Sequence, residues 1–160
     1  MNIFNLSATR LWSKKTLPTV APHLALGKWG EKVAANYIKQ CGYRIVASNF
    51  IAPIGHNQNG APTSGEIDMI AYDESASPYV LSFLEVKTRS GKSIALPEAA
   101  ITRQKQRQII KVARAFRRIM GLNDAPYRFD AISVLLEDED NIVLTLHKGY
   151  FTDNIRHIRS

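Results

Sequence analysis

The segments Gly65-Glu66-Ile67-Asp68 and Glu85-Val86-Lys87 decide how this sequence is interpreted. They lie in two apolar runs, 67–72 and 79–87, that are typical of β-strands, and a turn-forming stretch at 73–78 separates the runs. The two strands should therefore pair as an antiparallel hairpin. Burying carboxylates and an ammonium group there costs several kcal/mol per charge unless the charges are compensated. A divalent cation is the compensation that these residue types suggest.

The geometry of a strand brings three of these charges together. Side chains two residues apart point to the same face, so Glu85 and Lys87 should project together, and Asp68 should lie across from them. Two carboxylates suit Mg²⁺ or Mn²⁺, which would polarise a phosphate and lower the pKa of a bound water. Lys87 would orient the nucleophile or offset growing negative charge. The alternative is that Glu85 and Lys87 are solvated strand-end charges and that Asp68 accepts hydrogen bonds from a turn.

Working outward, apolar periodicity predicts two helices and three further strands. The helices are expected at 27–41 and 97–120, and the strands at 43–50, 128–136 and 142–147. The resulting order, α-β-β-β-α-β-β, is typical of an α/β domain in which helices flank a mixed β-sheet.

Length and composition indicate one soluble domain with an anionic partner. The chain has 160 residues, 45% of them hydrophobic, which is enough for a core. A net charge of +7 and a pI of about 9.7 favour a polyanion such as nucleic acid. The single cysteine, Cys41, excludes an intrachain disulfide and fits the reducing cytoplasm. No apolar stretch reaches the roughly 20 residues needed to cross a bilayer, so no membrane partner is expected.

We expect a single domain at 27–151. Residues 1–26 contain three Lys or Arg residues and no acid, and they predict a flexible basic extension rather than a targeting signal. Residues 152–160 are expected to form a C-terminal tail. Within the domain, 50–64 is rich in Gly, Pro and Asn and predicts a long loop, either a disordered insertion or a flap that grips a substrate.

The predicted helix at 97–120 is strongly basic. Seven Lys or Arg residues stand against one acid, Glu98. Such a helix would neutralise phosphates and make nucleic-acid binding sensitive to salt, although a solvated helix face is the alternative. The residues expected to contact nucleic acid are Arg89, Arg103, Lys105 and Arg107.

Four segments resemble the YraN-like family of small bacterial proteins: Gly27-Lys28-Trp29-Gly30-Glu31, Gly65-Glu66-Ile67-Asp68, Glu85-Val86-Lys87-Thr88-Arg89 and Arg128-Phe129-Asp130. The resemblance covers roughly residues 27–151. That family is placed in the restriction-endonuclease-like superfamily, the PD-(D/E)xK nucleases. The resemblance therefore implies a restriction-endonuclease-like fold with a mixed β-sheet flanked by helices.

The resemblance also implies roles for individual residues. Asp68 would match the superfamily's metal-binding aspartate, and Glu85 and Lys87 would match its (D/E)xK pair. Glu31 would match an additional glutamate of archaeal Holliday-junction resolvase relatives, which act on branched DNA. Its position on a predicted helix lets it lean toward the sheet, or it is simply a favourable acid near a helix N-terminus. The segment 50–64 is longer than in relatives, so the substrate class does not transfer.

Three functions follow, in decreasing order of support. The first is a Mg²⁺- or Mn²⁺-dependent endonuclease with Glu31, Asp68, Glu85 and Lys87 as catalytic residues, acting on DNA that is branched or single-stranded. The second is a non-catalytic nucleic-acid-binding protein that assists recombination, repair or DNA uptake. The third is a module that binds an acidic protein. The paired carboxylates and Lys87 favour the enzyme, because binding alone requires none of them. Homodimers are common in the superfamily, so a homodimer stays open.

Overall fold

The computed structural model describes residues 22–91, 101–137 and 141–154. Its helices and strands are α1 (Pro22–Gln40), β1 (Tyr43–His56), β2 (Pro62–Asp73), β3 (Val80–Ser90), α2 (Arg103–Ile119), β4 (Tyr127–Leu136) and β5 (Ile142–Phe151). The predicted order α-β-β-β-α-β-β is confirmed. The hairpin of two strands around the turn at 73–78 is confirmed as well, because β2 pairs antiparallel with β3.

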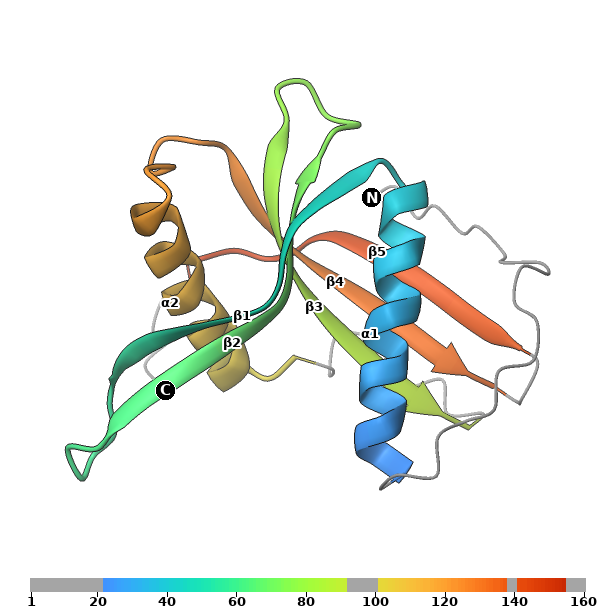
Figure 1. Ribbon diagram of the computed structural model, residues 1–160, viewed down its shortest axis with the longest axis horizontal. Helices are drawn as coiled ribbons and strands as arrows, with labels where there is room; N and C mark the ends of the chain where they lie inside the picture. Colours follow the sequence, from blue (N-terminus) through green and yellow to red (C-terminus); the bar gives the residue numbers. More distant parts are fainter. Residues whose placement is uncertain (1–21, 92–100, 138–140, 155–160) are drawn as a thin grey trace.

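The strands form one five-stranded sheet in the order β1-β2-β3-β4-β5. All neighbours are antiparallel except β3 and β4, which are parallel. A parallel pair needs a crossover connection, and α2 lies in that connection. The sheet is therefore mixed, with α1 and α2 on opposite faces (Figure 1).

Alternation along β3 separates the two layers of the core. Phe83 points into a cluster beneath α2, where its ring meets Phe116 edge-on at 6.0 Å between centroids. Leu84 points to the opposite face and packs with Ala34 and Ile38 of α1. This alternation places every second residue of β3 on the α2 side of the sheet.

The sheet splits between β2 and β3. Pairing of these two strands ends at Met69 and Leu84, whereas β3 stays paired with β4 as far as Ser90. The β1–β2 pair likewise continues to its tip, and Figure 1 shows the two arms diverging from the point of separation. Asp68 and Glu85 are the first residues beyond the last β2–β3 pair.

The prediction of a long loop over 50–64 is wrong. Most of these residues extend β1 and β2 into one hairpin, and the turn between the strands is confined to 57–61. Asn57 builds this turn, since its side-chain oxygen accepts the backbone N–H groups of Asn59 and Ala61. A register shift near Pro53, on a strand at the sheet edge, accommodates the proline and glycine that suggested a loop.

Both helices begin at other residues than predicted. α1 starts at Pro22, so 22–26 belong to the helix rather than to the basic extension. α2 starts at Arg103 rather than Pro97, because the Thr102 side chain accepts the N–H of Lys105 and caps the helix there. Residues 1–21, 97–100 and 155–160 lie outside the described part of the chain. Neither α1 nor α2 is long and apolar enough to cross a membrane.

Candidate active site

Glu85 is the most buried charge at the split in the sheet. It lies on the α2 side of β3 and is only 3% exposed. The Lys87 ammonium donates a hydrogen bond of 3.1 Å to Glu85 Oε1, while the Lys87 side chain stays 39% exposed. The prediction that these two residues project together is therefore confirmed.

Asp68 bonds to the β3 backbone between the same two residues. Its Oδ2 accepts the backbone N–H of Val86 at 2.7 Å, and Val86 stands between Glu85 and Lys87 in the chain. The carboxylate thus supplies a partner to a β3 backbone group beyond the last β2–β3 residue pair. Asp68 is bonded across the sheet and not within a turn, so the alternative proposed for it from the sequence is wrong.

The electrostatic state of Asp68 is unusual. Burial, and after it the nearby Glu85 carboxylate, raise the pKa of this carboxyl to about 7, against the lowering effect of the Val86 N–H and of Lys105. A carboxyl whose pKa is raised by a second carboxylate is frequent in catalytic and metal-binding sites.

Lys105 reaches the site from the first turn of α2. Its ammonium lies 3.2 Å from Glu85 Oε2 and donates a 3.3 Å hydrogen bond to the carbonyl of Glu66. Although this ion pair is close, Glu85 Oε2 is buried and accepts no hydrogen bond from the described residues. Lys105 thus contacts the candidate catalytic glutamate. Its predicted contact with nucleic acid stays a prediction.

Glu31 borders the site from α1. Its Oε2 accepts a 3.2 Å hydrogen bond from the Asn49 side chain, and its charge contributes to the raised pKa of Asp68. The approach of α1 depends on Gly30, because a Cβ atom there would lie 1.8 Å from the hydroxyl oxygen of Thr88 on β3. Close packing at Gly30 therefore sets the distance from Glu31 to the strands.

Asn49 is the site residue that the sequence analysis missed. It lies on β1 between the pairs Ser48–Met69 and Phe50–Ile67, which puts it opposite Asp68. Its φ of 51° is left-handed, a conformation that asparagine adopts more readily than most residues. An asparagine within a predicted strand is the signal that could have drawn attention to this position.

The other predicted contacts lie around this site. Arg103 and Arg107 are exposed on α2, and Arg89 is half-buried near the end of β3. On α2, exposed basic residues recur at three- and four-residue intervals and share one helical face: Arg103, Arg107, Lys111, Arg114 and Arg118. We call this set the basic stripe. Arg103–Ile119 contains no acid that would neutralise it.

The residues present fit a loosely held oxygen-bound cation. Within 22–91, 101–137 and 141–154, no three or more His, Cys, Asp or Glu side chains are grouped to hold a metal ion. Mg²⁺, however, is commonly held by one or two carboxylates, with water and substrate phosphate completing its coordination. Asp68 and the unbonded Oε2 of Glu85 match that requirement.

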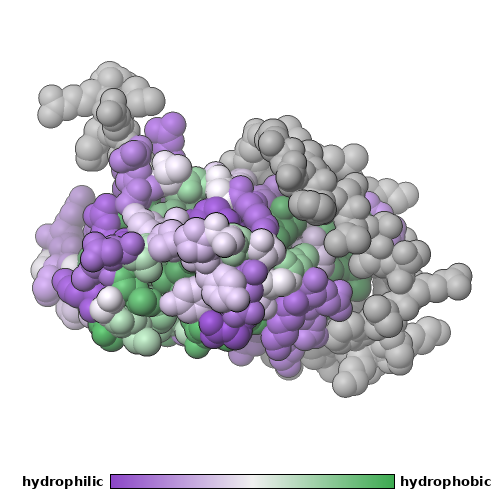
Figure 2. All heavy atoms as spheres, turned by 90° about the horizontal axis from the view of Figure 1, so that it is seen from above, coloured by the Kyte–Doolittle hydropathy of each residue, from purple (hydrophilic) through white to green (hydrophobic). Residues whose placement is uncertain are grey.

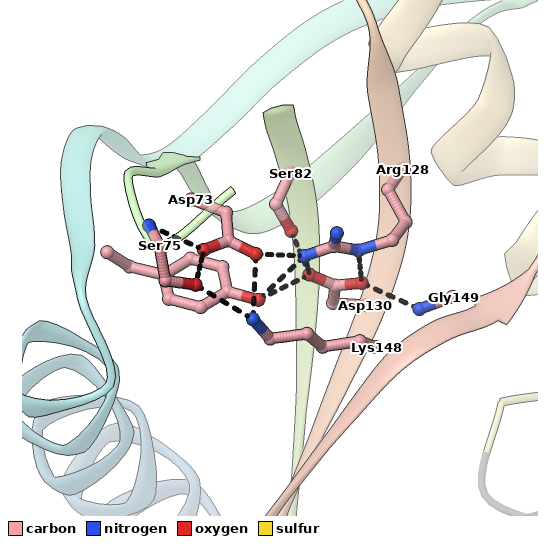
Figure 3. Close-up of polar contacts among 8 residues, drawn as sticks. Asp73, Ser75, Ser82, Arg128, Asp130, Lys148 and Gly149 are labelled. Atoms are coloured by element: carbon pink, nitrogen blue, oxygen red, sulfur yellow. Dashed lines mark hydrogen bonds and ion pairs between the residues drawn. The ribbon is translucent and has the colours of Figure 1, made fainter. Parts of the chain in front are cut away.

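A second group of charges, the Arg128 network, lies on the α1 side of the sheet (Figure 3). Arg128 pairs with Asp130 at 2.6 Å and with Asp73 at 2.8 Å, and Lys148 also pairs with Asp73 at 2.8 Å. The first of these pairs joins two residues of the Arg128-Phe129-Asp130 segment. Both carboxylates are almost fully buried and well paired, which indicates a structural role.

Apolar side chains are scattered over the described surface. On the face in Figure 2, hydrophilic residues alternate with small apolar areas. The exposed large apolar residues come from β1 (Val46 and Ile51), from the turn before β3 (Tyr79) and from the end of α2 (Ile119 and Met120). The homodimer stays a prediction.

Comparison with known proteins assigns the chain to a family. The model of the uncharacterised protein family UPF0102 matches residues 30–134. A UPF0102 protein of Trichlorobacter lovleyi is 39% identical over 114 residues, which are 71% of this chain and 80% of the relative. One of Chlorobium limicola is 38% identical over 120 residues, covering 75% and 81%. The chain therefore belongs to the UPF0102 family, in agreement with its resemblance to YraN-like proteins.

Proposed function

We propose that this protein is a Mg²⁺- or Mn²⁺-dependent endonuclease of the restriction-endonuclease-like superfamily that hydrolyses phosphodiester bonds in DNA. The observation that carries the proposal is the convergence of Asp68, Glu85 and Lys87 at the split between β2 and β3. The unbonded, buried Oε2 of Glu85 supports it, because a buried acceptor without a hydrogen bond is costly unless another group uses it. A cytoplasmic location is part of the proposal.

The side chains divide the chemistry among them. Asp68 and Glu85 would hold the cation, which when bound polarises the phosphate and lowers the pKa of water. The half-exposed ammonium of Lys87 would orient the attacking water or offset the negative charge that grows on the phosphate. Glu31, held by Asn49, would stay beside Asp68 and accept a proton or order a water there.

The basic stripe on α2 would bind the nucleic-acid backbone. At 1.5 Å per residue it extends over about 22 Å, which is long enough to meet several phosphates. Its first residue, Arg103, is two positions from Lys105, whose ammonium touches Glu85. A strand bound along the stripe would therefore be led to Asp68 and Glu85.

A specific observation favours the second function, non-catalytic nucleic-acid binding. Lys87 and Lys105 already pair with the two oxygens of Glu85, so the buried charge is compensated in the absence of a cation. A scaffold that only binds nucleic acid would keep such an arrangement. The enzyme remains the better proposal, because the pKa of Asp68 stays raised even though Lys105 lowers it.

Cleavage assays separate the two functions. Plasmid, single-stranded and four-way-junction DNA would be incubated with the parent protein in Mn²⁺ or in EDTA. The enzyme requires cleavage in Mn²⁺ alone and loss of at least a hundredfold in rate for Asp68→Asn, which keeps the size and can still accept the Val86 N–H. Lys39→Met, an exposed change at the far end of α1, serves as the matched control.

Two results would contradict the proposed nuclease activity. If Asp68→Asn cleaves as fast as the parent protein, the cleavage comes from a contaminant. If nothing is cleaved but band shifts show tight, salt-sensitive retention of DNA, the binding protein replaces the enzyme.

A further inference from the structure

We propose that Lys105 is an internal counter-ion that competes with the divalent cation for Glu85. The inference rests on the proposed function, since it assumes that Glu85 is a cation ligand. It begins from one contact: the Lys105 ammonium lies 3.2 Å from Oε2, the same buried oxygen that accepts no hydrogen bond. Lys105 therefore occupies the place next to Glu85 where a cation would bind.

The two lysines at Glu85 are held differently. Lys87 follows two residues later on the same strand and donates a hydrogen bond to Oε1. Lys105 belongs to α2, and its hydrogen bond goes to the Glu66 carbonyl while its contact with Glu85 is electrostatic. Leaving Glu85 costs Lys105 no hydrogen bond to that carboxylate, so Lys105 is the partner that a cation can displace.

The charges at the site favour such a displacement. Glu85 and Asp68 face two ammonium groups, those of Lys87 and Lys105. A divalent cation added to this arrangement would leave excess positive charge at a largely buried position, where Coulomb repulsion is poorly screened. Either an ammonium moves away or an anion arrives.

The position of Lys105 on α2 shows where its ammonium would go. It is two residues from Arg103 and from Arg107, so on the helix it projects toward the strands, on the side away from the basic stripe. Thr102 caps the helix on the Lys105 N–H, so the backbone stays in place when the side chain moves. Displaced from Glu85, the ammonium can turn outward at the N-terminal end of α2, because the Lys105 side chain is already 28% exposed.

The test measures Mn²⁺ binding to the free protein, without nucleic acid, from the electron paramagnetic resonance signal of unbound Mn²⁺. Lys105→Met should tighten Mn²⁺ binding about tenfold or more, because it removes the competing charge and keeps the length of the side chain. Lys105→Arg, which keeps the charge, should bind Mn²⁺ about as weakly as the parent. Lys39→Met removes one charge far from the site and controls for net charge.

Thermal unfolding gives a second readout that needs no catalysis. Without Mn²⁺, Lys105→Met should melt below the parent, because Glu85 has lost a counter-ion. Saturating Mn²⁺ should raise its melting temperature by more than it raises that of the parent, since the gain follows the ratio of ligand concentration to Kd.

Two failures are distinguishable. If the parent and Lys105→Met bind Mn²⁺ equally, and Glu85→Gln abolishes binding in both, the cation site stands and the competition by Lys105 is overturned. If millimolar Mn²⁺ binds neither the parent nor Lys105→Met nor Lys105→Arg, the proposed cation site fails, and the inference fails with it.

Discussion

Asp130 and Glu85 are almost fully buried carboxylates on neighbouring strands of one sheet, and their surroundings are opposite. Asp130 is 0% exposed and accepts hydrogen bonds from Arg128 and from three other residues: Tyr43, Ser82 and Gly149. Glu85 is 3% exposed, accepts one hydrogen bond from Lys87 and keeps a buried oxygen without any. The comparison sets a buried carboxylate with its hydrogen bonds made, which suits a structural role, beside one whose second oxygen faces the Lys105 ammonium at 3.2 Å without a hydrogen bond, which leaves that oxygen open to another partner.

The two regions also shift pKa values in opposite directions. Burial alone would raise the pKa of Asp73 in the Arg128 network, but hydrogen bonds from Lys148, Ser75 and Arg128 hold it well below its usual range. At the candidate active site, burial and Glu85 raise the pKa of Asp68 to about 7. The Arg128 network therefore favours the ionised form of Asp73, whereas the candidate active site disfavours the ionised form of Asp68.

The largest effect is expected from breaking the Arg128 network. Arg128→Met leaves Asp73 without one partner and Asp130 without its only cation among the described ion pairs, so it should lower the free energy of unfolding by about 3–5 kcal/mol. Urea denaturation measures this. Arg114→Met is the control: Arg114 is 64% exposed and 3.9 Å from Asp153, so its loss should cost under about 1 kcal/mol. Equal effects of the two changes would refute the structural role of the network.

A smaller effect is expected where α1 meets the candidate active site. Gly30→Ala places a methyl group against Thr88 and should cost about 1–3 kcal/mol by overpacking. Gly27→Ala, on the same helix, meets no atom within 4 Å and should be neutral or stabilising. Chemical denaturation of both variants, compared with the parent, measures the difference. A stable Gly30→Ala would mean that α1 can move away from β3 freely, and that its glycine does not set the position of Glu31.

The pH dependence of Asp68→Asn tests the difference in pKa shifts. Folding raises the pKa of the Asp68 carboxyl from 3.8 to about 7, so the folded protein binds this proton more tightly. The contribution of Asp68 to stability therefore falls as the pH rises from about 4 to about 7. The asparagine of Asp68→Asn does not titrate, so this loss of stability with rising pH disappears. Asp68→Asn should therefore be more stable than the parent at pH 8, by about 1 kcal/mol or more, and nearly equal to it at pH 4.

The Arg128 network should respond in the opposite sense. Because folding lowers the pKa of Asp73, the ionised carboxylate stabilises the protein at pH values above the pKa of the unfolded chain, and this stability is lost as the pH falls. Asp73→Asn should consequently destabilise the protein at pH 7 and lose part of that effect in acid. Thermal melts across the pH range follow both variants. A stabilising effect of Asp68→Asn that is the same at pH 4 and pH 8 would contradict the raised pKa.

The smallest effect concerns Asn49. Asn49→Gly relieves its left-handed backbone but removes the hydrogen bond to Glu31, and the two terms should cancel to within about 0.5 kcal/mol. Asn49→Ala loses the hydrogen bond and keeps the strain, so it should be about 1 kcal/mol less stable than Asn49→Gly. Urea denaturation of the pair measures the difference. Indistinguishable stabilities would show that the backbone at Asn49 is unstrained.

The errors of the sequence analysis have a common cause. Gly, Pro and Asn at 50–64 predicted a loop, but Ala52 and Ile54 bury against the α2 side of the core and hold the segment as strand. Pro97 was expected to open the second helix, but the Thr102 cap starts it at Arg103. In both places, packing or a hydrogen bond overrode local propensity, as happens where propensities differ by little.

What the sequence determined by itself is local in origin. Helix and strand periods depend on neighbouring residues, so the element order and the joint projection of Glu85 and Lys87 were predicted from spacing alone. Only the tertiary structure decided where β2 leaves β3, that Asn49 lies opposite Asp68, and that Lys105 reaches Glu85. These contacts join residues far apart in the chain, and they follow from the register of the strands and the docking of α2.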